Sequence, residues 1–337
     1  MICHFIGIFN KEELVGIALS QFLDLNTLES FGERDKCIKT SVRNFAFKNF
    51  CSNVLFIGNN MLTGQNAFSL SNKIDAKQAL QTLKLATLSL KNKLKSQHKK
   101  VHVTIFKDFC LADLIKFDIT EFKNNFQIST QPNMVFAIDE NWKTEEDYIN
   151  ALSKKYRDQY KRARKRAEGI EKRKMNLEDI IQHEETIYEL YFHVAKNAPF
   201  NTFFLPKNHF RIFKEHLKDH FLFYGYFIDK QLIGFNTLIK NGAVMDTYFL
   251  GYDDSIQREK MLYLNMLYDM IAYSINKRFK EIIFARTALE IKSSVGAKPI
   301  ETYGLIEHSN ALINTKMDKL FAYLEPKTVW KERNPFK

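Results

Sequence analysis

Residues 221–252 read FLFYGYFIDKQLIGFNTLIKNGAVMDTYFLGY, and this stretch decides the fold. Its apolar and aromatic runs predict three strands, Phe221–Ile228, Leu232–Ile239 and Ala243–Leu250. Lys230-Gln231 predicts the first turn. Asn241-Gly242 predicts the second, because both residues tolerate the positive φ that a tight hairpin needs. The stretch is therefore expected to form a three-stranded meander.

The residues after the meander complete the fold signal. Apolar residues recur at helical spacing over Lys260–Ile275, and Glu281–Ala285 is expected to return as a strand. A short helix and a last strand ending near Glu307 follow. A meander that feeds a helix and another strand resembles the core of an N-acyltransferase fold. We therefore expect an α/β (α+β) protein whose mixed, mostly antiparallel sheet is flanked by helices.

The first half of the chain shows the same succession of elements. Strands are expected at Cys3–Phe9, Leu14–Phe22 and Asn53–Ile57, then a helix at Ile74–Leu94 and a strand at Val101–Phe106. The halves share this order without obvious residue identity, which indicates two units of one kind. The first strand begins at residue 2 and leaves no room for the elements expected before such a meander. Either the first unit is trimmed, or the true start lies upstream.

A helical segment separates the two halves. Thr144 is a suitable N-cap, and the helix is expected to run from about Glu145 to Glu168, where Gly169 offers a stop. With 337 residues, two cores are a better expectation than one. We expect an N-terminal unit over residues 1–135, a C-terminal unit over 136–325 and a tail over 326–337.

The net charge of +11 is concentrated in one segment. Between Lys154 and Lys174 there are eleven Lys and Arg residues against three acidic ones. Such a run favours phosphates, whether of nucleic acid, of anionic lipid or of a nucleotide-carrying cofactor. A solvated helix face near a domain junction explains it equally well.

Composition indicates a globular protein that works without a metal. Hydrophobic residues make up 45% of the chain, and charge interrupts every apolar run before the roughly 18 residues that a membrane span needs. No secretory signal is visible, so the default location is the cytoplasm. The cysteines lack metal-ligand spacing, and we expect the clustered histidines to be surface residues of a helix. These are Cys3, Cys37, Cys51, Cys110, His209, His216 and His220.

Asp246 and Tyr248 alternate on the third strand of the meander, so their side chains share one face. A carboxylate and a phenol on a central strand are costly to bury unless they are used or paired. Acyl transfer to an amine needs a base for the amine proton. Asp246 is the candidate base, and Tyr248 is the candidate to bond the substrate or to protonate a leaving thiolate.

A donor that carries phosphate needs a cradle, usually of backbone N–H groups at the start of a helix. In the second unit, residues 253–260 are expected to form this cradle, and they contain no glycine. Gln257, Arg258 and Lys260 are the candidate donor-binding residues there, acting through their side chains. In the first unit, the loop Gly58–Gly64 precedes a helix, and Thr63 adds a hydroxyl.

The densest polar motif, RTALEIKSSVGAKP, spans Arg286 to Pro299 and follows the strand that ends at Ala285. Ligands of open α/β sheets bind at the carboxyl ends of strands. Glu290 follows Arg286 by four residues, which suggests a pair across one helical turn, and Lys292 lies on another face. Glu290 is a candidate catalytic residue. Arg286 and Lys292 are candidates for binding substrate or an anion.

These motifs resemble a known family. The meander, the segment Ala285–Ala297 and the basic run Leu152–Arg157 look like the BioF2-like acetyltransferase domain of the GNAT superfamily, over roughly residues 135–310. Within that run, Arg157 is a further candidate for binding substrate or an anion. With a first GNAT-like unit before it, the chain resembles the tandem FemAB-like transferases, which aminoacylate peptidoglycan precursors. The usual donor loop, Gln/Arg-x-x-Gly-x-Gly/Ala, is absent from residues 253–260.

The resemblance implies N-acyl transfer from acyl-CoA, or from an acyl carrier, to a primary amine. The amine acceptor would belong to lipid or cell-envelope biosynthesis. A FemAB-like enzyme that uses aminoacyl-tRNA is the first alternative, with the basic run of residues 154–166 on the tRNA. The second is a non-catalytic binder of nucleic acid or of anionic membrane. The absent donor glycines place CoA binding by the second unit in question.

Overall fold

The structure is a computed structural model, and it describes residues 1–25, 48–197, 203–317, 319 and 330–337. It forms two compact units. Unit 1 comprises Met1–Pro132 with Ile300–Val329, and unit 2 comprises Asn133–Pro299 with Trp330–Lys337. Residues 300–325, expected in the C-terminal unit, thus belong to unit 1, and the last eight residues belong to unit 2 and are not a separate tail. Cys37 lies outside the described residues.

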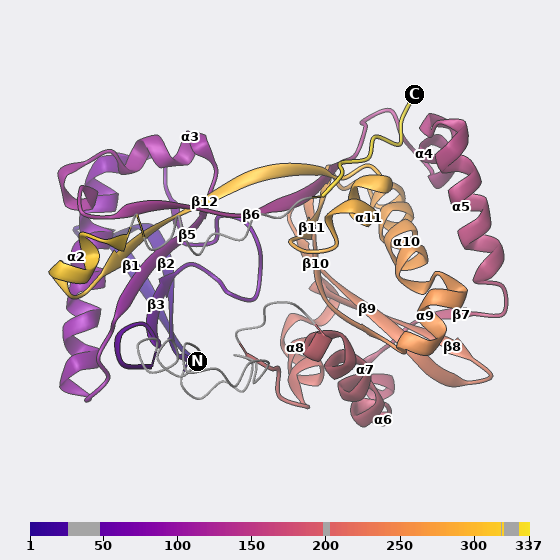
Figure 1. Ribbon diagram of the computed structural model, residues 1–337, viewed down its shortest axis with the longest axis horizontal. Coiled ribbons are helices and arrows are strands. Elements are labelled where there is room, and N and C mark those ends of the chain that lie inside the picture. The colour runs from indigo at the N-terminus through magenta and orange to yellow at the C-terminus, as the bar shows by residue number, and fades with distance from the viewer. Residues whose placement is uncertain (26–47, 198–202, 318, 320–329) are drawn as a thin grey trace. The chain divides into compact units, whose positions relative to one another are not determined.

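The sheet of unit 1 has the strand order β1-β2-β3-β5-β12-β6, and β4 pairs with β2 (Figure 1). Strands β3 and β5 pair in parallel, and β1–β2, β2–β3 and β5–β12 pair antiparallel. Strands β6 and β12 each have residues in both units. The elements are β1 Ile2–Asn10, β2 Glu13–Asp24, β3 Asn53–Ile57, β4 Phe68–Leu70, α2 Ala76–Ser96, β5 Val103–Phe109, α3 Leu111–Leu114, the 3-10 turns η2 Ile115–Phe117 and η3 Thr120–Phe122, β6 Phe126–Ala137, β12 Lys298–His308 and α12 Ala311–Asn314.

Helix α2 closes one face of this sheet. Asp75 caps it by accepting a hydrogen bond from the backbone N of Gln78 at 3.0 Å. Leu80 and Leu83 point into the core, where Phe106 meets the ring of Phe122 edge-to-face at 5.0 Å. This core belongs to unit 1 alone.

The sheet of unit 2 has the order β6-β11-β10-β9-β8-β7. Strands β10 and β11 pair in parallel, and all other neighbours pair antiparallel. The elements are α4 Glu145–Ala151, α5 Lys154–Arg166, β7 Glu171–Lys174, α6 Leu177–Gln182, α7 Glu184–Asn197, α8 His209–Leu217, the 3-10 turn η4 Lys218–His220, β8 Phe221–Ile228, β9 Gln231–Asn241, β10 Val244–Tyr252, α9 Asp254–Lys260, α10 Leu262–Asn276, β11 Glu281–Ala285 and α11 Leu289–Ser294.

The two units repeat one plan in detail. In each, a hairpin leads to a strand, a long helix and a second strand parallel to the first. The parallel ladder ends at Phe106 in unit 1 and at Ile283 in unit 2. Two residues further on, Asp108 and Ala285 both adopt positive φ, and both strands shift register there against their antiparallel neighbour. The repeated element order predicted from sequence therefore extends to a repeated irregularity.

Layers of helices on both faces hold the sheet of unit 2 in place. Helix α10 is buried along most of its length, and it packs into a core that includes Met245 and Ile282. Helix α7 lies on the other face, against β10. A Cβ on Gly251 would collide with the backbone of Leu190 and Tyr191, so glycine allows α7 to lie directly on the strand.

Three local expectations are wrong. The helix expected from Glu145 to Glu168 is two helices, because Leu152 and Ser153 are extended. Residues expected to form a donor loop form helix α9 instead. The first hairpin turn is made by Asp229 and Lys230, which both have positive φ. The capping box at Thr144 is present as predicted. Among the described helices, none combines the length and the apolar character needed to cross a membrane.

Candidate active site

The parallel pair of unit 2 is short and opens at its carboxyl end. Val244–Asp246 pair with Glu281–Ile283, and β10 then continues to Tyr252 with a register shift against β9. Thr247 closes the ladder with a hydrogen bond from its Oγ1 to the carbonyl oxygen of Ile283 at 2.9 Å. The carboxyl ends of neighbouring parallel strands are where α/β sheets bind ligands. Figure 1 shows α11 and α10 beside this end of β11.

The turn between β11 and α11 is strained. Ala285, Thr287 and Ala288 have φ of 60°, 68° and 47°, in a region that residues with a Cβ rarely adopt. Each such residue costs on the order of 1 kcal/mol, and clusters of them occur where a backbone is held for a function. The strained turn presents the carbonyl groups of Ala285 and Arg286 to one side chain.

That side chain is Lys292 of α11. Its Nζ donates to the carbonyl oxygens of Arg286 at 2.6 Å and of Ala285 at 3.3 Å. The residue is only 5% exposed, and burial lowers the pKa of Lys292 to about 7. A neutral amine has two N–H donors, enough for both carbonyls, whereas an ammonium has a third. Of the three cations predicted from the sequence to bind substrate or an anion, Lys292 is the buried one.

Asp246 lies at the last step of the parallel ladder and is buried. Its Oδ2 accepts a hydrogen bond from Nδ2 of Asn241 at 3.2 Å. Burial raises the pKa of Asp246, which the bond from Asn241 only partly offsets, and the charge of Glu281 raises it further. A carboxylate with a raised pKa is a better proton acceptor than an exposed one.

Tyr248 is buried with a partner that the sequence did not suggest. Its hydroxyl lies 3.0 Å from Nε2 of His209, and Phe213 stacks on its ring at 5.1 Å. Burial lowers the pKa of His209 to about 4 and raises the pKa of Tyr248 far above its ordinary value. The expectation of a surface histidine at 209 is wrong, because α8 turns this residue toward the sheet. The aromatic residues Phe210 and Phe213 were the sequence signal that this face of α8 is buried.

Glu290 contacts residues near the end of the chain. It accepts hydrogen bonds from the backbone N of Lys331 at 3.1 Å and from the guanidinium of Arg333 at 3.0 Å. These bonds lower the pKa of Glu290, which is therefore a carboxylate at neutral pH. The suggested one-turn pairing with Arg286 does not apply, because Arg286 precedes α11. Glu290 and Lys292 share a short helix but have different surroundings.

The candidate donor residues lie on α9. Arg258 is exposed, Gln257 and Lys260 are half-buried, and Nζ of Lys260 donates to the carbonyl oxygen of Glu168 at 3.4 Å. Both cations are in the last turn of the helix, where they complement its dipole. Arg157 donates to the carbonyl oxygen of Leu152 at the junction of α4 and α5. Within the described residues, no hydrogen bond or ion pair joins any of these four side chains to Lys292.

A half-buried charge cluster around Arg164 of α5 was not predicted from the sequence. Arg164 bridges Glu145 and Asp269, at 2.7 Å to each. Lys172 of β7 and the hydroxyl of Tyr226 also reach Asp269, at 3.4 Å and 2.9 Å. Burial lowers the pKa of Lys172, which Asp269 partly offsets. This cluster fixes α5 to α10, and its members come from segments too distant in sequence to be read as a group.

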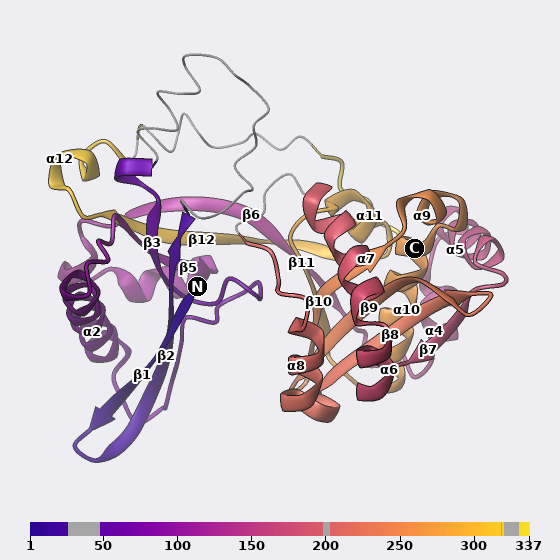
Figure 2. The ribbon, with the colours of Figure 1, turned by 90° about the horizontal axis from the view of Figure 1, so that it is seen from below.

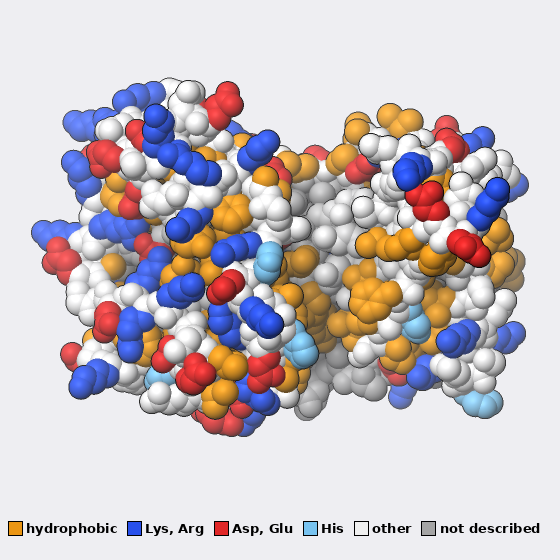
Figure 3. Space-filling model, turned by 180° about the vertical axis from the view of Figure 1, so that it is seen from behind, with side chains coloured by type: hydrophobic (Ala, Val, Ile, Leu, Met, Phe, Trp, Pro, Cys, Tyr) orange, Lys and Arg blue, Asp and Glu red, His pale blue; other side chains and the backbone are white. Residues whose placement is uncertain are grey.

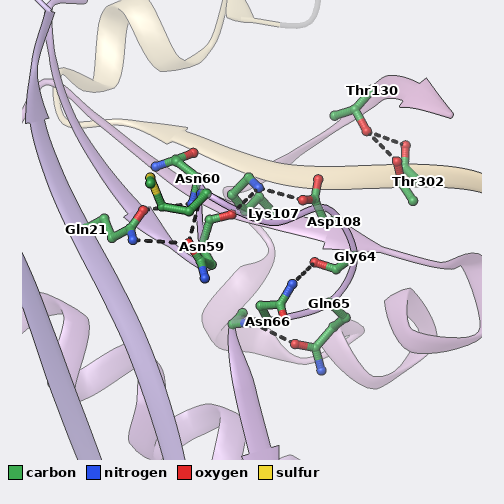
Figure 4. A network of polar contacts seen from close by, with 12 residues as sticks. Gln21, Asn59, Asn60, Gly64, Gln65, Asn66, Lys107, Asp108, Thr130 and Thr302 are labelled. Carbon is green, nitrogen blue, oxygen red and sulfur yellow. Dashed lines mark hydrogen bonds and ion pairs between the residues drawn. The ribbon is translucent and has the colours of Figure 1, made fainter. Parts of the chain in front are cut away.

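The glycine loop of unit 1 is filled by the protein itself (Figure 4). The side chain of Lys107 occupies the space beside Gly58 and donates to the carbonyl oxygen of Asn59 at 2.8 Å. It also pairs with Asp108. The side chain of Gln21 accepts a hydrogen bond from the backbone N of Asn60 at 2.8 Å. This loop is organised by its own polar network, and Thr63 is not among the residues that make it.

The part of the chain that the structure describes holds no cluster of three or more His, Cys, Asp or Glu residues suited to a metal.

No family model matches the sequence, and no curated protein matches it. Among solved structures, FemX is similar with a TM-score of 0.55 and 12% identity, over 95% of this chain and 90% of FemX. A tandem GNAT protein from the clavulanic acid biosynthesis pathway gives 0.49 and 8%, over 92% and 83%. L-PGS from Bacillus licheniformis gives 0.47 and 8%, over 82% and 83%.

The likeness to FemX covers nearly the whole chain and is evidence for the fold alone. Together with the repeated units, it confirms the expected fold class. The chain consists of two units of one plan, each with a mixed, mostly antiparallel sheet flanked by helices, in a fold similar to that of FemX.

The burial of Lys292 predicts a specific pH dependence of stability. The unfolded chain holds the proton on this lysine up to about pH 10, and the folded chain loses it near pH 7. Between these values the unfolded state binds more protons, so the free energy of unfolding rises with pH. Relative to Lys292→Met, the wild type should gain about 1.4 kcal/mol per pH unit between about pH 8 and 10 in urea unfolding.

Lys298→Met is the matched control, because the side chain of Lys298 is 54% exposed and pairs with Glu332 at the surface. Its stability difference from wild type should stay flat over the same range. A flat difference for Lys292→Met as well would show that Lys292 is not a buried titrating amine.

Proposed function

We propose that this chain is an N-acyltransferase whose reaction takes place at the open end of the β10–β11 pair in unit 2. The donor is an acyl thioester, carried on CoA or on a carrier, and the acceptor is a primary amine. The fold supports transfer chemistry of this kind only by analogy. The observation that carries the proposal is Lys292, a buried amine with a pKa near 7 held by a strained turn at the carboxyl end of β11.

In the proposed reaction, the amine nitrogen attacks the acyl carbonyl carbon. A C–N bond forms, and negative charge develops on the carbonyl oxygen. Lys292, as an ammonium, donates its third N–H to that oxygen, since the carbonyls of Ala285 and Arg286 occupy the other two. The intermediate collapses, the C–S bond breaks, and the thiolate leaves with the electron pair.

The amine proton must leave the nitrogen as the C–N bond forms. Asp246 is the proposed acceptor, because it lies at the last step of the ladder and its raised pKa suits it to the task. Tyr248 is proposed to orient substrate through its hydroxyl, since a phenol with a strongly raised pKa is a poor proton donor. Glu290 is proposed to act through position, by fixing α11 on Arg333.

The donor class is the finer part of the proposal. Acyl-CoA is the leading donor, with Gln257, Arg258 and Lys260 of α9 as its phosphate contacts. The BioF2-like and FemAB-like assignments, and an acceptor from lipid or envelope biosynthesis, rest on resemblance alone. A cytoplasmic location is proposed on the same basis. Peripheral contact with anionic membrane is also part of the proposal.

Aminoacyl-tRNA is the alternative donor, and one observation favours it. Helix α5 exposes a row of cations with a single acid among them, and Lys and Arg side chains gather in this region at the upper left of Figure 3. A face of this kind suits a nucleic-acid backbone. Its exposed members are Lys154, Lys155, Lys161, Arg162, Lys165 and Arg166.

Lys292→Met should lower the turnover of acyl transfer by about 10²–10³-fold, as loss of one oxyanion donor does elsewhere. The methionine keeps the buried volume, so the fold should persist. Because the ammonium is the active form, the ratio of wild-type to variant turnover should be largest below pH 7 and shrink above it. Lys298→Met, assayed in parallel, should retain wild-type turnover. Equal turnover of Lys292→Met and wild type would remove Lys292 from the reaction.

Asp246→Asn should lower turnover far more than it changes the affinity for the donor, because the amide cannot accept the amine proton. Donor affinity measured by calorimetry and turnover measured by mass spectrometry of the product separate the two quantities. Wild-type turnover in this variant would refute the assignment of Asp246 as base.

Calorimetry of the full chain with CoA, acetyl-CoA and longer acyl-CoAs, beside aminoacyl-tRNA in a salt series, distinguishes the donors. Micromolar affinity for acyl-CoA supports the leading proposal. Binding of tRNA that weakens by about one power of ten or more between 50 and 200 mM salt, with no binding of CoA, supports the alternative. Binding of tRNA or of anionic vesicles without transfer from any donor would identify a non-catalytic binder.

A further inference from the structure

The hairpin of β1 and β2 in unit 1 has an apolar face that the described residues leave open to solvent. Three consecutive cross-strand pairs on this face are Phe5 with Leu19, Gly7 with Ile17 and Phe9 with Leu14. Phe5 is 86% exposed, Phe9 60%, Ile17 55% and Leu14 51%. Hydrophobic side chains gather over this part of unit 1 in Figure 3, and Figure 2 shows the hairpin extending past the other strands of its sheet.

The internal repeat shows what covers the equivalent face in unit 2. There the hairpin of β8 and β9 has β7 along its outer edge, and α8 packs on its face. Phe210 of α8 meets the rings of Phe223 and Phe235 at 5.8 Å and 5.1 Å. Unit 1 has neither element among its described residues, because its strand order ends at β1. The apolar face of the β8–β9 hairpin is therefore covered in unit 2, whereas the described residues leave the equivalent face of the β1–β2 hairpin in unit 1 uncovered.

The edge of β1 is regular up to Ile8, and its register shift against β2 lies near the turn, between Ile8 and Phe9. Ile2–Phe9 contains no proline and no Lys, Arg, Asp or Glu. An unpaired edge of this kind offers backbone N–H and C=O groups to another strand. Two copies of β1 related by a two-fold axis pair antiparallel without bringing like charges together.

Charge argues against the other occupants of this face. Residues 2–24 carry one lysine and three acidic residues, so the hairpin has a net charge of −2 in a chain of +11. Glu13 is moreover paired with Lys73, and Lys11 is the one Lys or Arg within residues 2–24, so the hairpin itself lacks the group of cations that docks anionic lipid or nucleic acid. Pairing with a second copy along Ile2–Phe9 needs no such cations.

We propose that the β1–β2 hairpin is a docking surface for a second copy of this chain, through antiparallel pairing of β1 with β1, which joins the two apolar faces side by side into one. Phe5 and Phe9 lie on the paired strand and supply at most roughly 300 Å² per copy, since a phenylalanine buries about 200 Å². Two copies thus bury at most roughly 600 Å² of apolar side chain, which is below a standard interface, so the backbone hydrogen bonds of the paired strands add to it and the dimer is expected to be weak and reversible.

The test is sedimentation of the full chain over a concentration series up to about 1 mM, the range in which weak dimers form. The wild type should pass from 39.7 kDa to twice that mass. Phe5→Lys places a like charge on each copy at the interface and should weaken the dimer by at least about tenfold. Leu85→Lys is the control, because Leu85 is 66% exposed on α2 and away from the hairpin.

Hydrogen exchange of the β1 amides identifies the mode of association. Protection of alternate amides that rises with concentration supports strand pairing. A monomer at every concentration would overturn the proposal. A dimer whose dissociation constant is unaffected by Phe5→Lys would overturn it as well. Phe5-dependent binding of a monomer to vesicles of phosphatidylcholine and phosphatidylglycerol would overturn it in favour of a membrane surface.

Discussion

The interior position of one lysine amine constrains the end of β11 more than any other interaction in unit 2. Among the described residues Lys292 has no carboxylate partner, and a buried charge without one is costly, so its protonation is weakened until the amine is half neutral near pH 7. Its two carbonyl acceptors exist in this geometry only because the backbone from Ala285 to Ala288 adopts strained conformations. The strain of the turn and the low pKa of the lysine are therefore two consequences of one arrangement.

Packing of neighbouring segments stabilises the strained turn and the buried lysine. The last residues of the chain pack on α11 and α4, where the backbone of Arg333 donates to the Oγ of Ser293 at 3.0 Å and Phe336 meets Trp142 at 5.7 Å. Gly296 leaves room for the ring of Phe336, because a Cβ there would collide with it. The half-buried ion pairs of Arg164 connect α5 to Glu145 of α4 and to Asp269 of α10. Packing of this extent can hold a turn that costs a few kcal/mol in isolation.

Sequence reasoning reached the fold through local signals that tertiary contacts do not override. Asn241-Gly242, the apolar alternation of the meander and the periodicity of residues 260–275 depend on neighbours within a few positions. The site depends on contacts across many more. Lys292 was recognisable as one polar residue of a motif, but its burial depends on the packing of α11 in the folded chain, which a local pattern does not show. His209 was misassigned for the same reason, since its partner Tyr248 is 39 residues away. The predicted helix is interrupted at Leu152, which pairs with Phe336. No residue near Leu152 in the sequence predicts this contact.

The repeat of one plan in both units also indicates why the reaction is assigned to unit 2. Each unit ends its parallel ladder with a positive-φ residue two positions on, and each places a lysine near that point. In unit 1 the lysine is Lys107, which lies across Gly58 and is neutralised by Asp108, so the carboxyl end of the ladder is occupied by the chain itself. In unit 2 the lysine is Lys292, bonded to backbone carbonyls, and among the described residues no carboxylate pairs with it. The charge of Lys107 is offset by a carboxylate, whereas the charge that Lys292 carries when protonated is offset by carbonyl dipoles alone in the described part of the chain. Two copies of the same irregularity have thus acquired different electrostatics, and this difference is the reason why we propose that the second one stabilises a developing negative charge.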